Sequence, residues 1–183
     1  MTLGPVARAG AAEPYLGRNP AAAPTVRSAS TMPEPFSHVL RVRYGECDPQ
    51  GVVFNANYFA YFDVALTELW REAVGPYTDM MDAGVDMVVA EARARYLAPA
   101  GFDDELAIDV LVTRLGTTSM ITRMSVRRDS TVVVEGEMRH VFIDAATKGK
   151  IEIPAPIRRG LERHLAAETA EGPAEEPAWS TSA

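Results

Sequence analysis

Residues 44–70 read YGECDPQGVVFNANYFAYFDVALTELW, and this stretch decides the fold. Its first part is a turn-rich acidic loop, because Pro49 and Gly51 are both residue types that favour turns. The second part, from Tyr58 to Trp70, carries apolar side chains around most of a helical circumference. This pattern predicts a helix that is buried on nearly every side and therefore needs a sheet around it.

The junction between the loop and the helix also has chemical meaning. Asn55 and Asn57 offer N-cap side chains at the expected helix start. A helix begins with unpaired backbone N–H groups and partial positive charge, and Asp48 lies a few residues ahead of them. A carboxylate close to free N–H donors suits attack on a carbonyl group whose oxygen becomes negative.

The rest of the chain supplies the expected sheet. Residues 37–44 alternate apolar and charged side chains, which predicts a half-buried strand before the loop. Gly75 and Pro76 end the helix, and short loops between the later strands favour an antiparallel meander. The layout is α+β, with one buried helix against a five-stranded antiparallel sheet. The later elements are expected as a helical turn over 77–84, strands over 85–97, 105–114, 119–128 and 131–143, and a short helix from Pro156 to about Ala167.

The length and composition of the chain limit its possible functions. The 183 residues suit one domain, and the net charge of −7 argues against a general nucleic-acid binder. Cys47 is the single cysteine, so no intrachain disulfide can form. No run approaches the roughly 18 apolar residues of a membrane span. The default expectation is a cytoplasmic protein that needs no cofactor or metal and binds neither membrane nor nucleic acid.

Both ends of the chain differ in composition from its centre. Residues 1–35 are rich in Ala, Pro and Gly without a hydrophobic period, which predicts a disordered extension. Met32 is an alternative start, and a chain beginning there is expected to fold normally. Residues 168–183 are acidic and predict a solvated tail, which leaves 36–167 as the folded domain.

The loop and helix together carry a family resemblance. The motif GECDPQGVVF at 45–54, followed by Asn57, Tyr58 and Asp63, resembles the signature of the 4-hydroxybenzoyl-CoA thioesterase family of hotdog-fold proteins. The likeness covers about residues 38–165. It implies a hotdog fold, in which a five-stranded antiparallel sheet is wrapped around one long central helix. It also implies hydrolysis of acyl-CoA thioesters and assembly as a homodimer or homotetramer.

The resemblance also implies roles for single residues. Asp48 matches the residue that acts on the thioester as nucleophile or general base, and these two roles stay open. Asn55 matches the position whose backbone N–H polarises the thioester carbonyl. The family's best-known enzyme has Tyr at that position, and this difference bears on the acyl-group preference. Four further residues of the motif are assigned to substrate binding: Gly51, Val53, Phe54 and Tyr58.

Other residues in the stretch have competing interpretations. Some hotdog thioesterases place their acid on this helix, so the resemblance makes Asp63 the second candidate for the acid. A structural hydrogen bond is the simpler role for a carboxylate among apolar neighbours. Glu46 is interpreted as a solvated loop residue. Cys47 adjoins Asp48, but none of the three histidines forms a recognised partner motif, and a thiol without a base is a weak nucleophile.

Three other functions fit the same fold. A hydratase or dehydratase is disfavoured because no histidine lies between positions 38 and 140. A thioesterase for carrier-protein-bound chains and a non-catalytic acyl-binding protein both remain open. CoA phosphates need cations, but for each basic strand or turn residue a solvated sheet face is the simpler interpretation. The residues concerned are Arg93, Arg95, Arg127, Arg128 and Arg139.

Overall fold

The computed structural model describes residues 35–166, so the predicted extension over 1–35, apart from Pro35, and the predicted tail over 168–183 lie outside the described residues. The first predicted strand is shorter than expected, because a 3-10 turn over Tyr44–Glu46 takes its last residue. The elements in chain order are β1 (Phe36–Arg41), α1 (Asn57–Ala73), α2 (Tyr77–Asp82), β2 (Val85–Tyr96), β3 (Glu105–Leu115), β4 (Ser119–Arg128), β5 (Thr131–Asp144) and α3 (Ala155–Glu162).

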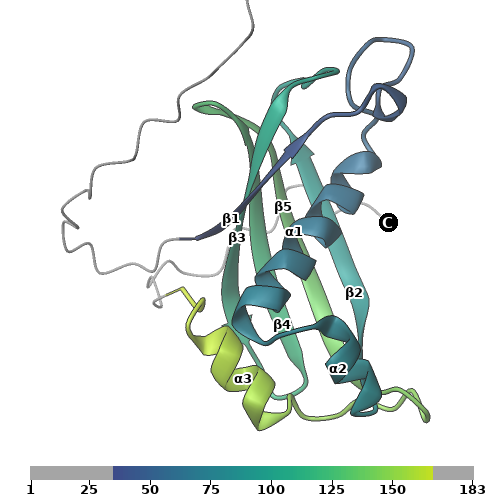
Figure 1. Ribbon diagram of the computed structural model, residues 1–183, viewed down its shortest axis with the longest axis vertical. Coiled ribbons are helices and arrows are strands. Elements are labelled where there is room, and N and C mark those ends of the chain that lie inside the picture. Colours follow the sequence, from purple (N-terminus) through teal and green to yellow (C-terminus); the bar gives the residue numbers. More distant parts are fainter. Residues whose placement is uncertain (1–34, 167–183) are drawn as a thin grey trace, which may run out of the picture. The chain divides into compact units, whose positions relative to one another are not determined.

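The five strands form one antiparallel sheet in the order β1-β3-β4-β5-β2 (Figure 1). The predicted five-stranded antiparallel sheet is confirmed, but the expected meander holds only from β3 to β5. Strand β2 pairs with β5 instead of its sequence neighbour β3. The segment after β2 turns away along β5, where Leu97 and Ala98 both donate their N–H groups to the Val133 carbonyl. Strands β1 and β2 are therefore the two edges.

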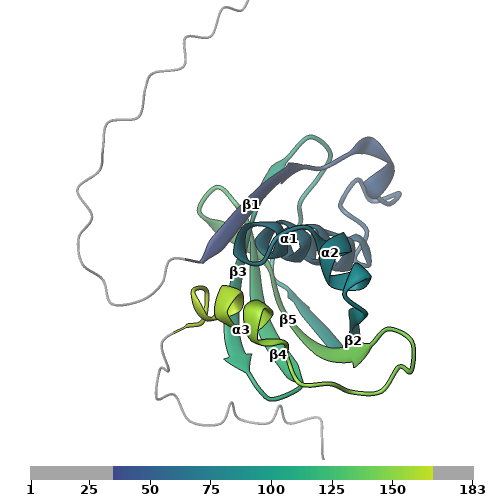
Figure 2. The same cartoon turned by 60° about the horizontal axis from the view of Figure 1, so that its bottom comes forward.

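Helix α1 packs on one face of the curved sheet (Figure 2). Alternate residues of β3 supply the centre of this layer, as period-2 patterning requires, and Ile108 and Val110 are fully buried. The Phe62 ring lies over Gly136 of β5, where a Cβ atom would meet the ring at 2.5 Å. Close contact between α1 and the sheet therefore depends on a residue without a side chain.

The prediction that the helix is buried on nearly every side is wrong for this single chain. The side of α1 away from the sheet exposes Ala60, Asp63, Val64 and Thr67. The physical reason is that a five-stranded sheet covers only one side of a helix. The predicted N-cap hydrogen bonds are also not formed, because the cap residue is Ala56.

Helix α3 packs against the C-terminal end of α1. Gly160 lies so close to α1 that an added Cβ would meet the Ala73 carbonyl oxygen at 2.4 Å. The Arg163 guanidinium donates a 2.8 Å hydrogen bond to the same oxygen. Helix α3 ends at Glu162, several residues before the predicted end. No helix within residues 35–166 is long and apolar enough to cross a membrane.

Candidate functional site

Asp48 lies at the tip of a short hairpin whose two sides meet at Cys47 and Val53. The Asp48 carbonyl accepts the Gly51 N–H at 2.9 Å, and Asp48 Oδ1 accepts the Gln50 N–H at 2.8 Å. Gly51 has φ of 78°, a conformation that costs other residues energy, which agrees with its prediction as a turn-forming glycine. The turn thus holds the half-buried Asp48 side chain in one local arrangement.

The hairpin is fixed to the sheet through the segment between β2 and β3. The Val53 N–H donates to the Ala100 carbonyl at 2.8 Å, and Val52 forms a bridge with Gly101. Val53 is 5% exposed, so its side chain anchors the loop in the core. A substrate-binding role for Val53 would therefore be indirect, through the placement of the loop.

Glu46 is part of this anchoring, and its interpretation as a solvated residue is wrong. Its Oε2 atom accepts the Tyr61 hydroxyl at 2.8 Å and the Arg43 N–H at 2.7 Å. Its carbonyl accepts the Asn57 side-chain amide at 2.8 Å. Burial, and then the hydrogen bond to Glu46, raise the pKa of Tyr61 well above its usual range. Glu46 therefore joins the loop to the first two turns of α1.

Two backbone donors lie open at the beginning of α1. The Asn57 N–H donates to the Phe54 carbonyl, but within residues 35–166 no backbone carbonyl accepts the N–H of Asn55 or Ala56. Both residues are exposed. The Asn55 carbonyl, in contrast, accepts the Tyr96 hydroxyl from the end of β2 at 3.1 Å. This bond fixes the peptide at the helix start, where partial positive charge is expected.

Phe54 and Tyr58 occupy very different environments, although both were predicted to bind substrate. The Phe54 side chain is 52% exposed beside the helix start. Tyr58 is 3% exposed, and its ring makes edge-on contacts with Tyr61 and Tyr96 at 5.7 Å between centroids. Burial raises the pKa of Tyr58 to about 12. The Phe54 side chain is thus available to a ligand, whereas the Tyr58 ring packs in the core at the helix start.

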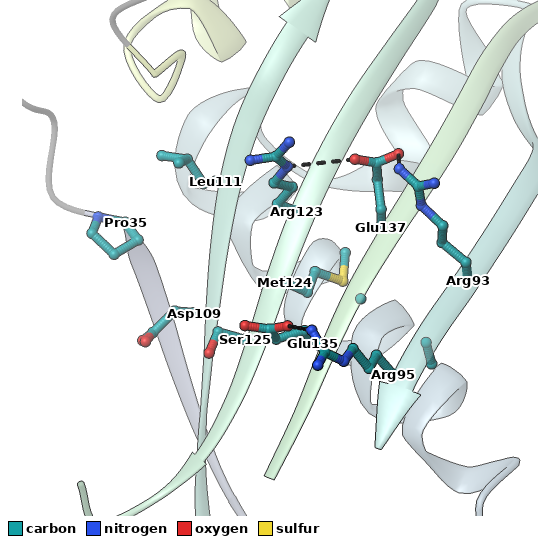
Figure 3. Close-up of a pocket in the computed structure, with 12 residues that line it drawn as sticks. Pro35, Arg93, Arg95, Asp109, Leu111, Arg123, Met124, Ser125, Glu135 and Glu137 are labelled. Atoms are coloured by element: carbon teal, nitrogen blue, oxygen red, sulfur yellow. Dashed lines mark hydrogen bonds and ion pairs between the residues drawn. The ribbon is translucent and has the colours of Figure 1, made fainter. Parts of the chain in front are cut away.

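One cavity in the described part of the chain lies on the sheet face away from α1 (Figure 3). Its volume is about 550 Å³, and six of its twelve lining residues carry charged side chains. Glu137 pairs with Arg93 at 2.5 Å and with Arg123 at 3.5 Å, and Arg95 faces Glu135 at 3.9 Å. Asp48 does not line this cavity.

The arginines considered for CoA phosphates all have acidic neighbours. Arg127 and Arg128 bind Asp109 and Asp104 at 2.6 and 2.8 Å, and Arg139 lies 3.2 Å from Glu91. These pairs reduce the positive charge that a phosphate would meet. They agree with the interpretation of these arginines as charge-balanced residues rather than phosphate ligands.

Another cavity, of about 180 Å³, lies between α1 and the edge strand β2. Two of its wall residues are deeply buried side chains with polar atoms that are not among the predicted site residues, Trp70 at 1% and His140 at 4% exposure. Trp70 Nε1 and His140 Nδ1 have no hydrogen-bond partner within the described residues. Asp63 lies at the exposed side of this cavity, and partial burial raises the pKa of its carboxyl group. Asp48 does not line this cavity either. The complete lining is Asp63, Leu66, Thr67, Trp70, Tyr77, Met87, Val89 and His140.

Within residues 35–166, no group of three or more His, Cys, Asp or Glu side chains is arranged to hold a metal ion. The candidate groups near the junction of the loop and α1 are a carboxylate on a fixed turn, two N–H donors without a backbone acceptor within the described residues, and an exposed aromatic side chain. The residues are Asp48, Asn55, Ala56 and Phe54.

Comparison with known proteins gives consistent matches to one group. Residues 42–161 match the family model of the thioesterase-like superfamily. A putative esterase of Aquifex aeolicus is 30% identical over 70% of this chain and 98% of its own length. The acyl-CoA thioester hydrolase YbgC of Escherichia coli is 34% identical over 67% of this chain and 92% of its own length. A solved structure of a hypothetical protein from Thermus thermophilus superimposes with a TM-score of 0.67 at 27% identity, covering 70% of this chain and 98% of that one.

Proposed function

Because the chain belongs to the thioesterase-like superfamily, we propose that it is a thioester hydrolase acting on acyl-CoA, with Asp48 as the reacting carboxylate. The observation that carries the proposal is the combination of a fixed carboxylate with open N–H donors at a helix start a few residues later. The relatives named above include an acyl-CoA thioester hydrolase, which supports the same substrate class.

The open N–H groups of Asn55 and Ala56 would receive the thioester carbonyl oxygen. Negative charge develops on this oxygen when a nucleophile adds to the carbonyl carbon, and fixed N–H donors stabilise it. The Tyr96 hydroxyl donates to the Asn55 carbonyl, which belongs to the same peptide unit as the Ala56 N–H. This hydrogen bond supports the role because it holds that peptide unit in place before substrate arrives.

Asp48 would then drive the reaction in one of two ways. As general base it takes a proton from water, whose oxygen adds to the carbonyl carbon. As nucleophile its carboxylate oxygen adds instead and forms a mixed anhydride, which water then hydrolyses. In both routes the carbon–sulfur bond breaks, the CoA sulfur leaves as thiolate and takes up a proton, and the acyl group leaves as a carboxylic acid.

A second copy of the chain would complete the site. Strand β2 is a 12-residue edge strand with exposed Val88 and Val89, and an unpaired edge of this length favours pairing with another strand. Asp63 and Thr67 on the exposed side of α1 lie next to this edge, and Asp48 lines neither of the two cavities described above. We therefore propose a homodimer formed through β2, with the helices as the centre of a hotdog arrangement. Sedimentation equilibrium tests this, and a mass of one chain at micromolar concentration would contradict it.

Thiol release from a panel of acyl-CoAs tests the catalytic assignment. Asp48→Asn is expected to lower kcat about 1,000-fold, within the range of a lost acid–base or nucleophilic group. Asp79→Asn is the matched control, because Asp79 is exposed in the first turn of α2 and should leave the rate unchanged. An unchanged rate in Asp48→Asn, or a larger loss in Asp63→Asn, would reject Asp48 as the reacting carboxylate.

A further inference from the structure

Two exposed aromatic rings lie beside the hairpin that holds Asp48. The Tyr44 side chain is 82% exposed, and the Phe102 side chain is 59% exposed. Their rings meet edge to face, with 5.8 Å between the centroids and 86° between the planes. Aromatic rings contribute most when they are buried in a core or an interface. A pair of rings open to water at one place therefore marks a surface for a ligand or a partner.

The backbone around the two rings is fixed. The Val42 N–H donates to the Asp104 carbonyl at 2.9 Å, and the Asp103 N–H donates to the Val42 carbonyl at 3.1 Å. These bonds continue the pairing of β1 with β3 and hold the segments that carry Tyr44 and Phe102 side by side. The rings are therefore in place before any ligand binds, which lowers the entropy cost of binding.

The same two segments are joined to the Asp48 hairpin. The Tyr44 carbonyl accepts the Cys47 N–H at 3.4 Å, and Gly101 of the second segment forms a bridge with Val52. Because Tyr44 precedes Asp48 by only four residues, their Cα atoms are at most about 14 Å apart. The pantetheine arm of CoA is long enough to cross this distance. A thioester at Asp48 therefore has its nucleotide within reach of the rings.

One cation lies next to the rings. Arg43 is exposed, and its guanidinium forms no ion pair within residues 35–166. Arg41, in contrast, pairs with Asp103 and Glu105 at 3.5 and 3.0 Å. Figure 1 shows α3 at the end of the sheet away from the start of α1. The other cations of the described chain without an ion pair lie towards that end: Arg114, Lys148, Lys150, Arg158, Arg159 and Arg163.

Two open rings beside an unpaired guanidinium suit a phosphorylated nucleotide. A purine base stacks on an exposed aromatic ring, and a guanidinium binds phosphate oxygens through parallel N–H groups. The chain has a net charge of −7, so an anionic ligand needs such a local cation. The nucleotide of CoA carries both an adenine base and phosphates. An acidic protein surface fits less well, because a broad contact would also meet Asp103 and Glu105.

We propose that Tyr44, Phe102 and Arg43 form the binding site for the nucleotide part of CoA, with the adenine base on the ring pair and a phosphate group on the guanidinium. This inference rests on the proposed function and locates the nucleotide of its substrate. Strands β1 and β2 are opposite edges of the sheet, so pairing of two copies through β2 leaves this site open. Because the nucleotide is remote from the reacting carbonyl, the site binds substrate and transition state equally and lowers KM without changing kcat.

Two thioesters that differ only in the nucleotide test this site. The acyl group is the one that the wild type hydrolyses fastest, carried either by CoA or by pantetheine alone. Tyr44→Ala and Phe102→Ala are each expected to raise KM for the acyl-CoA about tenfold and to leave KM for the acyl-pantetheine unchanged. Arg43→Gln should act in the same way, because it removes the charge that meets the phosphate. Tyr44→Phe keeps the ring and should restore the wild-type KM.

Lys150→Gln is the matched control for the charge. Lys150 is also exposed and without an ion pair within residues 35–166, but it lies in the segment between β5 and α3. Its loss should leave KM for both thioesters at the wild-type value. A rise in KM for the acyl-CoA equal to that in Arg43→Gln would show that only the overall charge matters and would overturn the assignment of Arg43.

A binding measurement separates this proposal from the catalytic one. Calorimetric titration with free CoA needs no turnover, and Tyr44→Ala, Phe102→Ala and Arg43→Gln should each weaken binding about tenfold. Asp48→Asn should bind CoA as the wild type does, so its loss of rate bears only on the catalytic assignment. Circular dichroism confirms that each variant is folded.

Three results would overturn the nucleotide site. The first is an equal Kd for CoA in the wild type and the three variants, and the second is an equal loss for the acyl-CoA and the acyl-pantetheine. The third is a loss confined to a thioester on an acidic carrier protein, which would assign the rings to a protein partner. Titration with ATP separates the two nucleotide sources, because tighter binding of ATP than of CoA would assign the rings to a free nucleotide.

Discussion

The Asp48 loop and the cavity between α1 and β2 differ in whether their polar groups have hydrogen-bond partners. In the loop, Asp48 and Glu46 accept hydrogen bonds from the backbone or from Tyr61 at 2.7 to 2.8 Å. In the cavity, Trp70 and His140 are more deeply buried and have no partner within the described residues. A satisfied network is rigid before substrate arrives, whereas unpaired groups gain most from a ligand. The loop is thus held by its own hydrogen bonds, whereas the polar atoms of Trp70 and His140 are buried without any within the described residues.

The strongest test of the rigid loop is to distort the turn that holds Asp48. Gly51→Val places a β-branched side chain at φ of 78°, which should lower the free energy of unfolding by about 1 to 3 kcal/mol. Because Asp48 is held by the same turn, thioester hydrolysis should fall about 100-fold. Gly45→Ala is the control, since Gly45 has an ordinary φ and open space around its Cβ position. A Gly51→Val protein with the full rate would show that the turn does not position Asp48.

The buried His140 beside the cavity predicts that the free energy of unfolding depends on pH. The pKa of His140 is about 4 in the folded chain and about 6.5 when unfolded. Between these values the unfolded state binds more protons, so this contribution to stability is complete above about pH 6.5 and is lost as pH falls toward 4. The free energy of unfolding should therefore drop by about 2 kcal/mol between pH 7 and pH 5.

Urea unfolding of the wild type and His140→Leu at both pH values measures this drop. Asp63 and Tyr77 face the same cavity, and the raised pKa of Asp63 acts in the opposite direction, so the difference between the two proteins isolates His140. An equal drop in both proteins would contradict the assignment of the neutral, buried imidazole.

The same contrast explains what could be predicted from sequence. The loop, the helix and the strand pattern depend on local signals, such as Gly51 at a turn and alternation along β3, and these positions agree with expectation. The pairing of β2 with β5 and the position of His140 opposite Val89 depend on segments far apart in the chain. A histidine flanked by strand residues gives no sign of this environment. The role of Glu46 had a weak local signal, because a Glu three residues after the cap residue of a helical turn commonly accepts the N–H of that residue, here Arg43.

The smallest expected effect tests how much the loop depends on its tie to α1. Tyr61→Phe removes the hydroxyl that donates to Glu46 Oε2 and leaves that oxygen with the Arg43 N–H alone. The free energy of unfolding should fall by roughly 1 kcal/mol, and kcat should fall a few-fold with little change in KM. Tyr44→Phe is the matched control, because the Tyr44 side chain is 82% exposed. If Tyr61→Phe changed neither stability nor rate, the rigidity of the loop would have to come from the sheet side, through Val53 and Ala100, and the comparison between a fixed loop and an open cavity would rest on that contact instead.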